Sequence, residues 1–579
     1  MAKGIFMRWV EDSVSEETAE RLSRSLAISP ILSRFLVARG FADPSSVRTF
    51  LKPSLGDLAN PFDLPSMKEA VDRLIQSLNK KESVLIVGDY DVDGITSTVM
   101  LSRVLTALGN EPAHITPKRK EEGYGLTCAV LERGLQMGDI DLVVALDCGT
   151  NSSEEYAFLK SKGIDLLVVD HHQAKADTPD GAILLNPHLH QDDGEPWRNL
   201  CTAGLTFKLS HGLIKSLREN DQETAKGVNP KDYLALASLG TLADMVPLQG
   251  ENRILARYGL KHLGHQPGFG LESLISVSGI TSSPSLDAED VTFRIAPRIN
   301  ACGRLNMPEF ATELLLSEDP EACKSLASKI DGFNIERREI ESELTAEAVA
   351  MAEENFSDEP AVVVFGEGNH WNPGVVGIVA GKLASSLQKP CIVLAKDGSE
   401  YKGSGRSIPG VDMVSTLSHC KELLTHWGGH PAAVGMNLPQ ENLVQFQEAF
   451  ILAVTEITKG NLPEPFLTIN ATINPEDLRP ELLLEINNLA PFGQENPEPT
   501  LALRGVRLSG PPRRVGSGDH FQFSIFNGEE SISGIAWQMG DNLPPTSYPL
   551  DLALRFRWNH WNGRRLPQMV LRDWRKAEE

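Results

Sequence analysis

The chain contains 579 residues, of which 41% are hydrophobic and 23% are charged, and it carries a formal net charge of −23. These fractions are ordinary for a globular protein, and the length predicts roughly three to five domains. No uninterrupted apolar run reaches the ~18–20 residues that a membrane-spanning helix needs. The composition therefore excludes a helical membrane protein, and we expect no membrane partner.

The seven cysteines are scattered, odd in number and without a CxxC pair. This pattern is typical of reduced thiols and argues against both a disulfide framework and a zinc site. Residues 1–9 lack the sustained apolar core of a secretory signal. We therefore expect a cytoplasmic protein.

The acidic net charge argues against a nucleic-acid partner, because binding to phosphates requires basic surface. The charge is unevenly distributed, however, since residues 501–579 contain 11 Lys and Arg against 8 Asp and Glu. The excess of acid lies upstream of a relatively basic tail, so the net charge of the whole chain decides little about partners.

Residues 1–65 are expected to form a helical segment that ends in proline-rich sequence. A stretch with apolar residues at helical spacing, 67–78, then leads into three apolar runs that predict buried strands and that each end in acidic residues. These runs are 84–88 followed by Asp89, Asp91 and Asp93, 140–146 followed by Asp147, and 164–169 followed by Asp170, His171 and His172.

Segments compatible with helices, 95–108 and 152–162, alternate with these runs, and the alternation predicts a parallel, doubly wound sheet. Ligands bind beyond the carboxyl ends of the strands in such sheets, so the three acidic ends are expected at one edge. An apolar helix predicted at 231–242 leads to a further carboxylate, Asp244.

Carboxylates mixed with one or two imidazoles favour Mn²⁺ or Mg²⁺ over metals that prefer thiolates. The ligands are too many for one ion, so we expect a pair of ions. The alternative interpretation is a set of acidic turns at strand ends with two surface histidines, and each motif taken alone would fit it.

The second half of the chain begins with a long charged segment, 317–355, that predicts a helix bridging two lobes. A second α/β pattern starts at 361–365 and continues through 391–395. Beyond about Pro463, short alternating runs predict a small β-barrel or sandwich. The clearest of these runs are 501–507, 520–526, 532–537 and 552–558.

The expected fold is therefore an α/β lobe with a parallel sheet, joined by a long helix to a second, smaller α/β lobe and followed by a β-barrel. The expected domains are the helical segment at 1–65, the catalytic domain at 66–310, the connecting helix at 311–355, the second lobe at 356–458 and the barrel at 459–579.

Four motifs stand in order at Asp89–Gly94, Leu146–Gly149, Asp170–His172 and Ala243–Pro247, and they resemble the motifs of the DHH phosphoesterases. Further stretches narrow the resemblance to the RecJ family of single-strand-specific DNA exonucleases. They are 122–126, 200–204, 296–304, 374–380, 403–407, 428–430 and 489–497. The resemblance covers about residue 60 to the C-terminus. It implies a DHH lobe, a DHH-associated substrate-binding lobe and a nucleic-acid-binding barrel of the OB type.

The resemblance also implies roles for the acidic residues and their neighbours. Asp91 and Asp147 would bind one metal ion, and the other ion would be bound by Asp93, Asp147, His171 and Asp244. Asp89 and Asp170 would orient these ligands, and with Asp147 and His172 they complete the expected catalytic group. The candidates for phosphate contacts are His172, Arg298, Asn300, Arg304, Arg406 and His430.

Two points qualify these assignments. Each arginine taken alone would also fit a surface ion pair in so acidic a chain. The family usually carries a Trp-His pair before Gly374, whereas this chain has Trp371 followed by Asn372, with His370 displaced.

In the predicted barrel, arginines interleave with aromatic residues, a combination with which OB-type barrels bind single strands. The strongest candidates for nucleic-acid binding are Arg513, Arg514, Trp558, Arg564 and Arg565. Phe521 and Phe523 alternate with a polar residue and are expected to fill the barrel core.

The resemblance implies a metal-dependent exonuclease that degrades single-stranded DNA 5′→3′ to 5′-mononucleotides in DNA repair and recombination. One alternative is a DHH-type phosphodiesterase or phosphatase acting on short oligonucleotides or cyclic dinucleotides. Another is a catalytically inactive replication scaffold, against which the intact acidic motifs argue. The family suggests a single-stranded-DNA-binding protein and a helicase as partners, and we expect a monomer.

Overall fold

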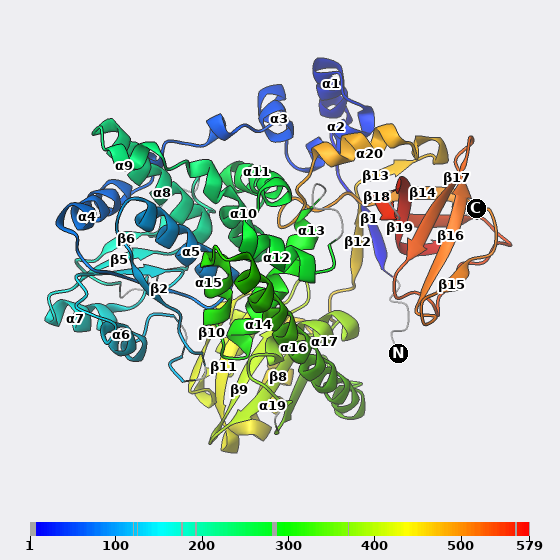
Figure 1. Ribbon diagram of the computed structural model, residues 1–579. Coiled ribbons are helices and arrows are strands. Elements are labelled where there is room, and N and C mark those ends of the chain that lie inside the picture. Colours follow the sequence, from blue (N-terminus) through cyan, green and yellow to red (C-terminus); the bar gives the residue numbers. More distant parts are fainter. Residues whose placement is uncertain are drawn as a thin grey trace. The chain divides into compact units, whose positions relative to one another are not determined.

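The computed structural model describes residues 7–119, 121–123, 125–174, 178–190, 194–280, 286–368, 370–561 and 564–577. Tyr124, within the motif at 122–126, lies outside these ranges. The chain folds into two compact units (Figure 1). Unit 1 comprises residues 1–41, 335–486 and 499–579, and unit 2 comprises residues 42–334 and 487–498. No helix within the described ranges is long and apolar enough to span a membrane.

Unit 2 is built on a five-stranded sheet in which all neighbouring strands are parallel, as the sequence predicted. In spatial order the strands are β3 (Ala113–Ile115), β2 (Val84–Gly88), β4 (Leu142–Leu146), β5 (Asp165–Val169) and β6 (Ile183–Leu185). Every residue of β2 and β4 is buried. This burial explains why these strands are continuous apolar runs rather than alternating ones.

Helices cover both faces of this sheet (Figure 1). Ile86 of β2 packs in the core with α4, α5 and α8, whereas its neighbours Leu85 and Val87 pack with α6 and α7. The α-helices of unit 2 are α3 (Pro44–Leu51), α4 (Met67–Lys80), α5 (Val92–Ala107), α6 (Cys128–Leu135), α7 (Ser153–Ser161), α8 (Thr202–Glu219), α9 (Glu223–Lys226), α10 (Leu234–Ala243), α11 (Gly250–His265), α12 (Phe269–Val277), α13 (Ala288–Asp290), α14 (Ala296–Arg304) and α15 (Glu309–Leu316).

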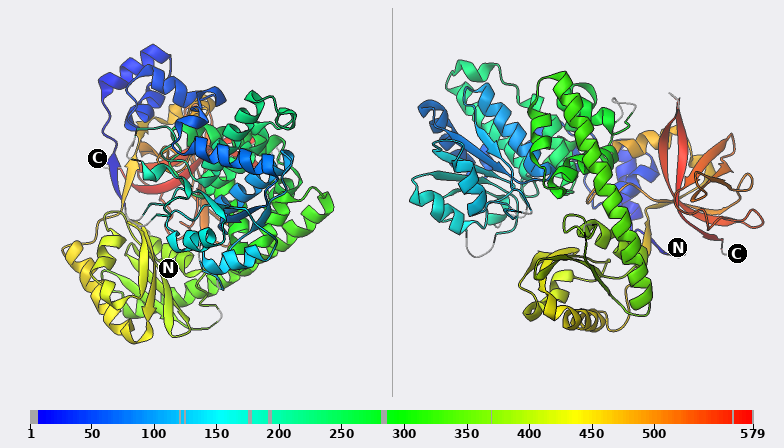
Figure 2. Two further views of the ribbon diagram at one scale, coloured as in Figure 1. Left: turned by 90° about the vertical axis from the view of Figure 1, so that its left-hand side faces the viewer. Right: turned by 60° about the horizontal axis from the view of Figure 1, so that its bottom comes forward.

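Short helical turns join these elements. They are the 3₁₀ turns η1 (Leu55–Asp57), η2 (Pro61–Asp63), η3 (Pro187–Leu189) and η4 (Pro230–Tyr233), and the π-helical turn η6 (Val291–Ile295). The predicted long helix is α16 (Pro320–Asn355), a continuous helix of 36 residues that begins in unit 2 and ends in unit 1 (Figure 2).

One sheet of unit 1 has the order β10-β11-β9-β8-β7 and is mixed, since only β7 and β8 pair in parallel. Its elements are β7 (Val362–Gly366), α17 (Val376–Leu387), β8 (Cys391–Asp397), β9 (Glu400–Arg406), α18 (Met413–Ser418), η7 (Lys421–Leu423), β10 (His426–His430), β11 (Ala433–Pro439), η8 (Gln440–Asn442) and α19 (Leu443–Ile457).

The C-terminal sheet of unit 1 has seven strands in the order β13-β14-β18-β19-β17-β16-β15. Phe521 and Phe523 are buried in this part of the chain, which confirms their expected place in the core. The elements are β13 (Ala471–Ile473), η9 (Pro475–Asp477), α20 (Pro480–Asn488), β14 (Leu501–Val506), β15 (Arg513–Val515), β16 (His520–Phe526), β17 (Ser531–Ala536), β18 (Leu550–Trp561) and β19 (Arg564–Lys576).

The N-terminal segment differs from the helical expectation at its start. The strand β1 (Arg8–Glu11) precedes α1 (Glu16–Leu26) and α2 (Pro30–Ala38), and it pairs in parallel with β12 (Phe466–Ile469). A strand whose partner lies more than 450 residues away leaves no local signal in the sequence.

Candidate metal centre

Three acidic residues follow directly on the parallel strands of unit 2 and extend the sheet's hydrogen bonding by one residue. The backbone N–H groups of Asp89, Asp147 and Asp170 donate to the carbonyls of Leu146, Val169 and Leu185, over 3.1, 3.0 and 3.2 Å. Asp147 has φ 64°, a left-handed conformation that is uncommon outside glycine and occurs at functional sites. The three carboxyl groups therefore start from one edge of the sheet, as predicted.

Beyond Gly88 the chain turns into α5, and this turn separates the aspartates of the first motif. Asp91 is the N-cap of α5, where its Oδ1 accepts hydrogen bonds from the backbone N–H groups of Asp93 and Gly94 over 2.9 and 3.1 Å. A Cβ at Gly94 would lie 2.4 Å from the carbonyl oxygen of Asp89, so only glycine permits this tight turn.

Asp93 is buried and bound by the N-terminus of α8. Its Oδ2 accepts from the N–H of Thr202 over 2.8 Å, and its Oδ1 accepts from the N–H of Ala203 over 2.7 Å. The first N–H groups of a helix have no partners within the helix and carry a partial positive charge. This helix end therefore fixes the orientation of the Asp93 carboxylate.

One imidazole nitrogen faces three carboxylates. The Nε2 of His171 lies 3.5 Å from Oδ1 of Asp147, 3.5 Å from Oδ2 of Asp244 and 3.9 Å from Oδ2 of Asp93. Asp244 reaches this position as the C-cap of α10. Asp93, His171 and Asp244 each offer one ligand atom within 4.8 Å of the others.

A second group of ligand atoms adjoins the first. Asp89, Asp91 and Asp147 offer oxygens within 4.8 Å of one another. An oxygen of Asp147 and ring nitrogens of His171 and His172 form a further group at the same spacing. Asp147 therefore takes part in two of the three groups, beside carboxylates on one side and imidazoles on the other. The buried Oδ1 of Asp89 has no hydrogen-bond partner within the described part of the chain. An unsatisfied buried oxygen suits a metal ligand better than the supporting role expected from the sequence.

Burial and mutual repulsion raise the pKa values of several carboxyl groups in this cluster. Burial, followed by the charge of Asp91, raises the pKa of Asp89 and of Asp93 to about 7. Burial and the charge of Asp93 raise the pKa of Asp244 to about 9 and that of Asp147 well above its usual range. The carboxylates cannot all carry charge at neutral pH without a compensating cation.

Asp170 and His172 form a hydrogen-bonded pair beside the cluster. Oδ1 of Asp170 lies 2.7 Å from Nδ1 of His172 and also accepts from the backbone N–H groups of His171 and His172. Burial would raise the pKa of Asp170, but the hydrogen bond and charge of His172 hold it below its usual range. The same hydrogen bond raises the pKa of His172 to about 9.

The residues expected to contact phosphate have different surroundings. The guanidinium of Arg298 donates to Asp331, to the carbonyl of Arg294 and to the carbonyl of Val277, which favours a structural role. Asn300 and Arg304 lie on α14, whose Gly303 packs so tightly on Tyr90 that a Cβ there would come within 2.4 Å of the Tyr90 ring. This contact brings the C-terminal end of α14 beside the first acidic motif.

Arg406 and His430 belong to unit 1 and not to the carboxylate cluster. Arg406 ends β9, where it donates to Ser404 Oγ over 2.7 Å and to the carbonyl of Gly405 over 2.9 Å, and its burial lowers its pKa. His430 ends β10 with an exposed side chain. Both remain candidates for phosphate contacts.

Asn372 stands where the family usually has histidine, and it shapes the start of α17. Its Oδ1 accepts from the N–H of Gly374 over 2.7 Å, and its carbonyl accepts from Val375 and Val376. The displaced His370 instead places Nε2 2.6 Å from Oε2 of Glu347 on α16. At this spot Asn372 therefore supplies a turn, and His370 is bound to α16.

Comparison with known proteins places these residues in a family. The DHH family N-terminal domain matches residues 83–241, the DHHA1 domain matches 358–456, and the RecJ OB domain matches 469–573. The single-stranded-DNA-specific exonuclease RecJ of Bacillus subtilis (strain 168) is 34% identical over 577 residues, which cover 98% of this chain and 70% of that protein. The chain belongs to the RecJ family. RecJ of Salmonella typhimurium (strain LT2) is 31% identical over 582 residues, covering 96% of this chain and 97% of that protein.

Solved RecJ structures share the fold. The crystal structure of RecJ in complex with Mn²⁺ from Thermus thermophilus matches with a TM-score of 0.83 at 28% identity, covering 99% of this chain and 80% of that one. The Mg²⁺ complex from the same organism matches with a TM-score of 0.77 at 27% identity, covering 99% and 79%. The carboxylate-rich donor set of this RecJ-family chain fits either ion, because both Mn²⁺ and Mg²⁺ prefer carboxylate oxygens.

Several residues that position the RecJ-type cluster had no assigned role in the sequence. The hydroxyl of Thr202 donates to Oδ1 of Asp147 over 2.9 Å. The N–H of Thr150 donates to Asp170 over 3.2 Å, and Asn186 donates to the Thr150 hydroxyl and to the carbonyl of His172. Thr202 lies in the stretch 200–204, which carries part of the family resemblance. This resemblance was the signal in the sequence that could have indicated a role for Thr202 at the site.

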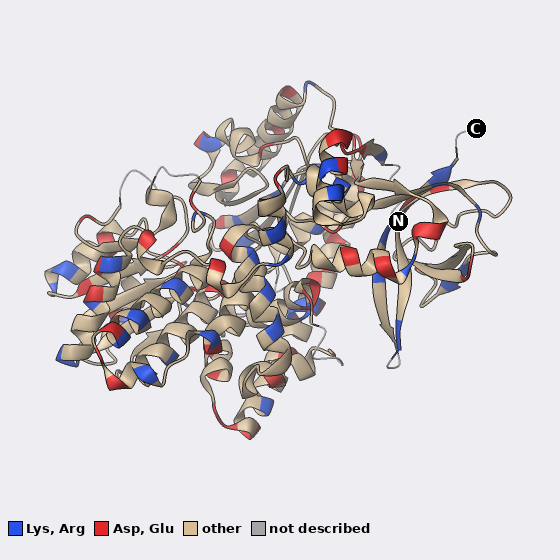
Figure 3. Cartoon of the chain, turned by 90° about the horizontal axis from the view of Figure 1, so that it is seen from above, with Lys and Arg blue, Asp and Glu red and all other residues tan. Residues whose placement is uncertain are grey.

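The basic candidates of the RecJ OB domain are mostly exposed. Arg513, Arg514, Arg564 and Arg565 are exposed, and the guanidinium of Arg565 lies 4.1 Å from the ring centroid of the partly buried Trp558. Arg514 lies 3.6 Å from the exposed Asp541. Figure 3 shows Lys and Arg among Asp and Glu on most elements rather than gathered on one. These basic candidates are therefore individual exposed side chains on separate strands.

Proposed function

We propose that this RecJ-family chain is an exonuclease that hydrolyses single-stranded DNA in the 5′→3′ direction and releases 5′-mononucleotides, using two divalent cations. The observation that carries the proposal is the position of Asp147, which belongs to one donor group with Asp89 and Asp91 and lies 3.5 Å from Nε2 of His171, a member of the adjoining group with Asp93 and Asp244. A shared carboxylate between two sets of hard donors is the arrangement that a two-metal centre requires. Polarity and product rest on the family resemblance alone.

The donors divide into two sets, each suited to Mn²⁺ or Mg²⁺. Asp89, Asp91 and Asp147 would hold one ion, and Asp93, Asp147, His171 and Asp244 would hold the other. Asp89 is thereby assigned as a ligand, because its buried Oδ1 is otherwise unsatisfied. Bound cations supply Lewis-acid activation of water and neutralise charge on the phosphodiester.

His172 would contribute a cation of the chain's own. Asp170 holds its Nδ1, so the imidazolium can donate from Nε2 to a phosphate oxygen or to the leaving oxygen. Its side chain is 53% exposed and therefore accessible to a substrate. The pKa of about 9 keeps His172 protonated at neutral pH.

Asn300, Arg304, Arg406 and His430 are proposed to contact the phosphates of the strand. We exclude Arg298 from this set because its guanidinium already donates to three protein acceptors. In the OB domain, Arg513, Arg514, Arg564 and Arg565 would bind the DNA backbone, and Trp558 with its stacked arginine would contact bases. The match to a RecJ OB domain favours long strands over short oligonucleotides or cyclic dinucleotides as substrates.

The remaining assignments also stay proposals. They are a cytoplasmic monomer, a role in DNA repair and recombination, and association with a single-stranded-DNA-binding protein and a helicase. Each rests on the family resemblance and on the composition of the chain.

Digestion of end-labelled DNA tests the proposed activity. Single strands labelled at the 5′ or the 3′ end, the matching duplex and a dinucleotide are incubated with Mn²⁺ and then with Mg²⁺. We expect the 5′ label to appear at once as mononucleotide, the 3′-labelled strand to shorten progressively, and the duplex to resist. Release of the 3′ label first would contradict the polarity, and preferential hydrolysis of the dinucleotide would favour the alternative substrate class.

A further inference from the structure

Two large apolar side chains of unit 2 are exposed to solvent, on segments that adjoin the proposed metal ligand Asp244. Phe293 is 72% exposed, more than any other large hydrophobic residue in the described ranges, and Met245 is 60% exposed. Scattered exposed apolar residues are normal on protein surfaces. The positions of these two on the backbone distinguish them.

Met245 follows directly on the proposed metal ligand Asp244. Its φ of 58° lies in the left-handed region. This conformation is strained for a residue with a side chain and persists only where the surrounding structure stabilises it. The turn therefore fixes Asp244 at the cluster and presents the Met245 side chain to solvent immediately beside it.

Phe293 lies in the π-helical turn η6, which is tied to the same end of α10. The hydroxyl of Thr292 donates to the carbonyl of Leu242 over 3.4 Å, so the residue before Phe293 contacts the turn that carries Asp244 and Met245. Short π-helical turns often occur at functional sites. Val291 and Ile295 of the same turn are fully buried, which leaves Phe293 on the exposed side.

The segment that contains Phe293 borders the acidic cluster at two points. It begins beside Leu242, two residues before Asp244, and it continues through α14 to Gly303, which packs on Tyr90 between Asp89 and Asp91. The segment therefore adjoins the cluster at both of its ends, within reach of a strand whose phosphodiester enters the cluster.

We propose that Phe293 and Met245 together form an apolar shelf on which an unpaired base next to the scissile phosphodiester stacks. The proposal rests on the exonuclease function proposed above and adds to it a stacking residue. An aromatic ring accepts any base, because every base has a π-face, so the shelf suits an enzyme without sequence preference. A base in a duplex is paired and stacked and cannot lie on the shelf, which makes Phe293 a contributor to single-strand specificity.

The test pairs a side-chain truncation with removal of the base. Phe293→Ala and wild type are compared on a normal single strand and on strands with an abasic nucleotide at the first or at the second position from the 5′ end. We expect Phe293→Ala to lower kcat/KM on the normal strand about 5- to 100-fold. The loss should disappear on one of the abasic strands, because the stacked base is already missing there.

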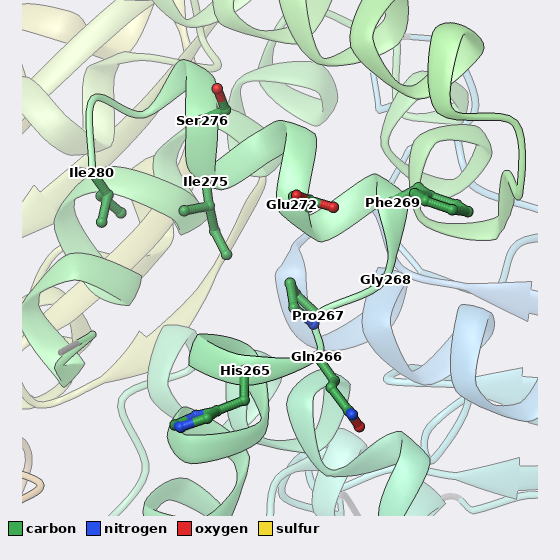
Figure 4. Close-up of a pocket in the computed structure, with 9 residues that line it drawn as sticks. All are labelled: His265, Gln266, Pro267, Gly268, Phe269, Glu272, Ile275, Ser276 and Ile280. Atoms are coloured by element: carbon green, nitrogen blue, oxygen red, sulfur yellow. The ribbon is translucent and has the colours of Figure 1, made fainter. Parts of the chain in front are cut away.

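A matched control separates stacking from general damage. Phe269→Ala truncates another exposed phenylalanine of unit 2, one that lines a pocket with His265, Glu272 and Ile275 but with none of the proposed metal ligands (Figure 4). Phe269→Ala should cleave all three strands like wild type. Mn²⁺ titration by calorimetry should give the same affinity for Phe293→Ala as for wild type.

Two outcomes would contradict the proposal that a base stacks on Phe293. Equal losses for Phe293→Ala on normal and abasic strands would mean that Phe293 does not contact a base, and an unchanged rate on the normal strand would mean that it has no role. Failure of wild type to cleave any strand would instead refute the exonuclease function itself, so the two hypotheses are distinguishable.

Discussion

The hydroxyl of Thr202 lies 2.9 Å from Oδ1 of Asp147 and donates to it, at the point where the two donor groups of the metal centre meet. The backbone N–H of the same threonine binds Asp93. One residue at the start of α8 therefore orients two of the proposed ligands.

Thr202→Val should weaken metal binding, because it removes the hydroxyl donor while it keeps the size of the side chain and the backbone N–H. Loss of a hydrogen bond to a ligand typically lowers metal affinity by about 10- to 100-fold. Calorimetric titration with Mn²⁺ measures this change, and Thr202→Ser, which keeps the hydroxyl, should bind nearly as well as wild type. Wild-type affinity in Thr202→Val would contradict the proposed role.

The raised pKa values predict how the stability of the metal-free protein depends on pH. Asp89 and Asp93 titrate at about 7 and Asp244 at about 9 when folded, well above the value of 3.8 for a free aspartate. Between these limits the folded chain binds more protons than the unfolded chain, so its free energy of unfolding falls as the pH rises.

Bound cations should stabilise the folded protein more strongly as the pH rises, because only deprotonated carboxylates are metal ligands. Thermal unfolding with chelator and with saturating Mn²⁺ should show a stabilisation by metal that grows from about pH 5 to about pH 9. Asp93→Asn should flatten this dependence, and Asp541→Asn, which changes an exposed aspartate of unit 1, should not. A stabilisation by Mn²⁺ that is the same at every pH would refute the carboxylate cluster as the binding site.

The raised pKa of His172 predicts that the reaction rate falls at alkaline pH. Since its pKa is raised to about 9 by Asp170, kcat/KM should fall as the pH rises through that value and the imidazolium loses its proton. His172→Gln should lower the rate roughly 100-fold or more and abolish this alkaline limb. The measurement is the pH–rate profile of both proteins, and a limb of unchanged position in His172→Gln would assign it to another group.

Replacement of Arg253, which no proposed site includes, is expected to have a large effect on the stability of unit 2. Arg253 is 2% exposed, and its guanidinium donates to four backbone carbonyls, those of Phe50, Asn488, Leu489 and Ala490. The carbonyl of Leu489 also accepts from the amide of Asn496, so Arg253→Met would take the Arg253 donor chiefly from the other three carbonyls. At about 1–3 kcal/mol for each buried group, unit 2 should lose at least about 3 kcal/mol. Chemical denaturation measures the loss.

Arg257→Met is the matched control for this variant. Arg257 lies one turn further along α11 and donates to the single carbonyl of Leu51 over 3.0 Å. Arg257→Met should lower the free energy of unfolding by about 1 kcal/mol, the net contribution of an ordinary hydrogen bond. Equal losses at the two positions would contradict the importance of the four-carbonyl contact.

Local sequence patterns were sufficient for the framework of the site. The runs 84–88 and 140–146 are the strands β2 and β4 within one or two residues, and Asp244 ends α10 as expected. Fully buried parallel strands are continuous apolar runs, and a parallel sheet presents its carboxyl ends at one edge. The positions of Asp89, Asp147 and Asp170 directly after predicted parallel strands therefore placed these three side chains at one edge.

Contacts between distant segments could not be predicted in the same way. Thr202 binds Asp147 across 55 residues, and Arg253 binds Leu489 across 236 residues. The residues around Arg298 in the sequence do not indicate that its guanidinium donates to Asp331. Likewise, the residues around Asp89 do not indicate that its Oδ1 has no hydrogen-bond partner in the described part of the chain. These features depend on the tertiary structure and not on the periodicity of any one segment.

The most direct test of the two-metal centre is the activity of Asp147→Ala, since Asp147 is the carboxylate common to both proposed ligand sets. Purified wild type and Asp147→Ala are compared in hydrolysis of a labelled single strand with Mn²⁺ and with Mg²⁺, and in binding of the same strand. We predict that the variant binds the strand nearly as well as wild type and hydrolyses none of it. Substantial hydrolysis by Asp147→Ala would contradict the two-metal centre.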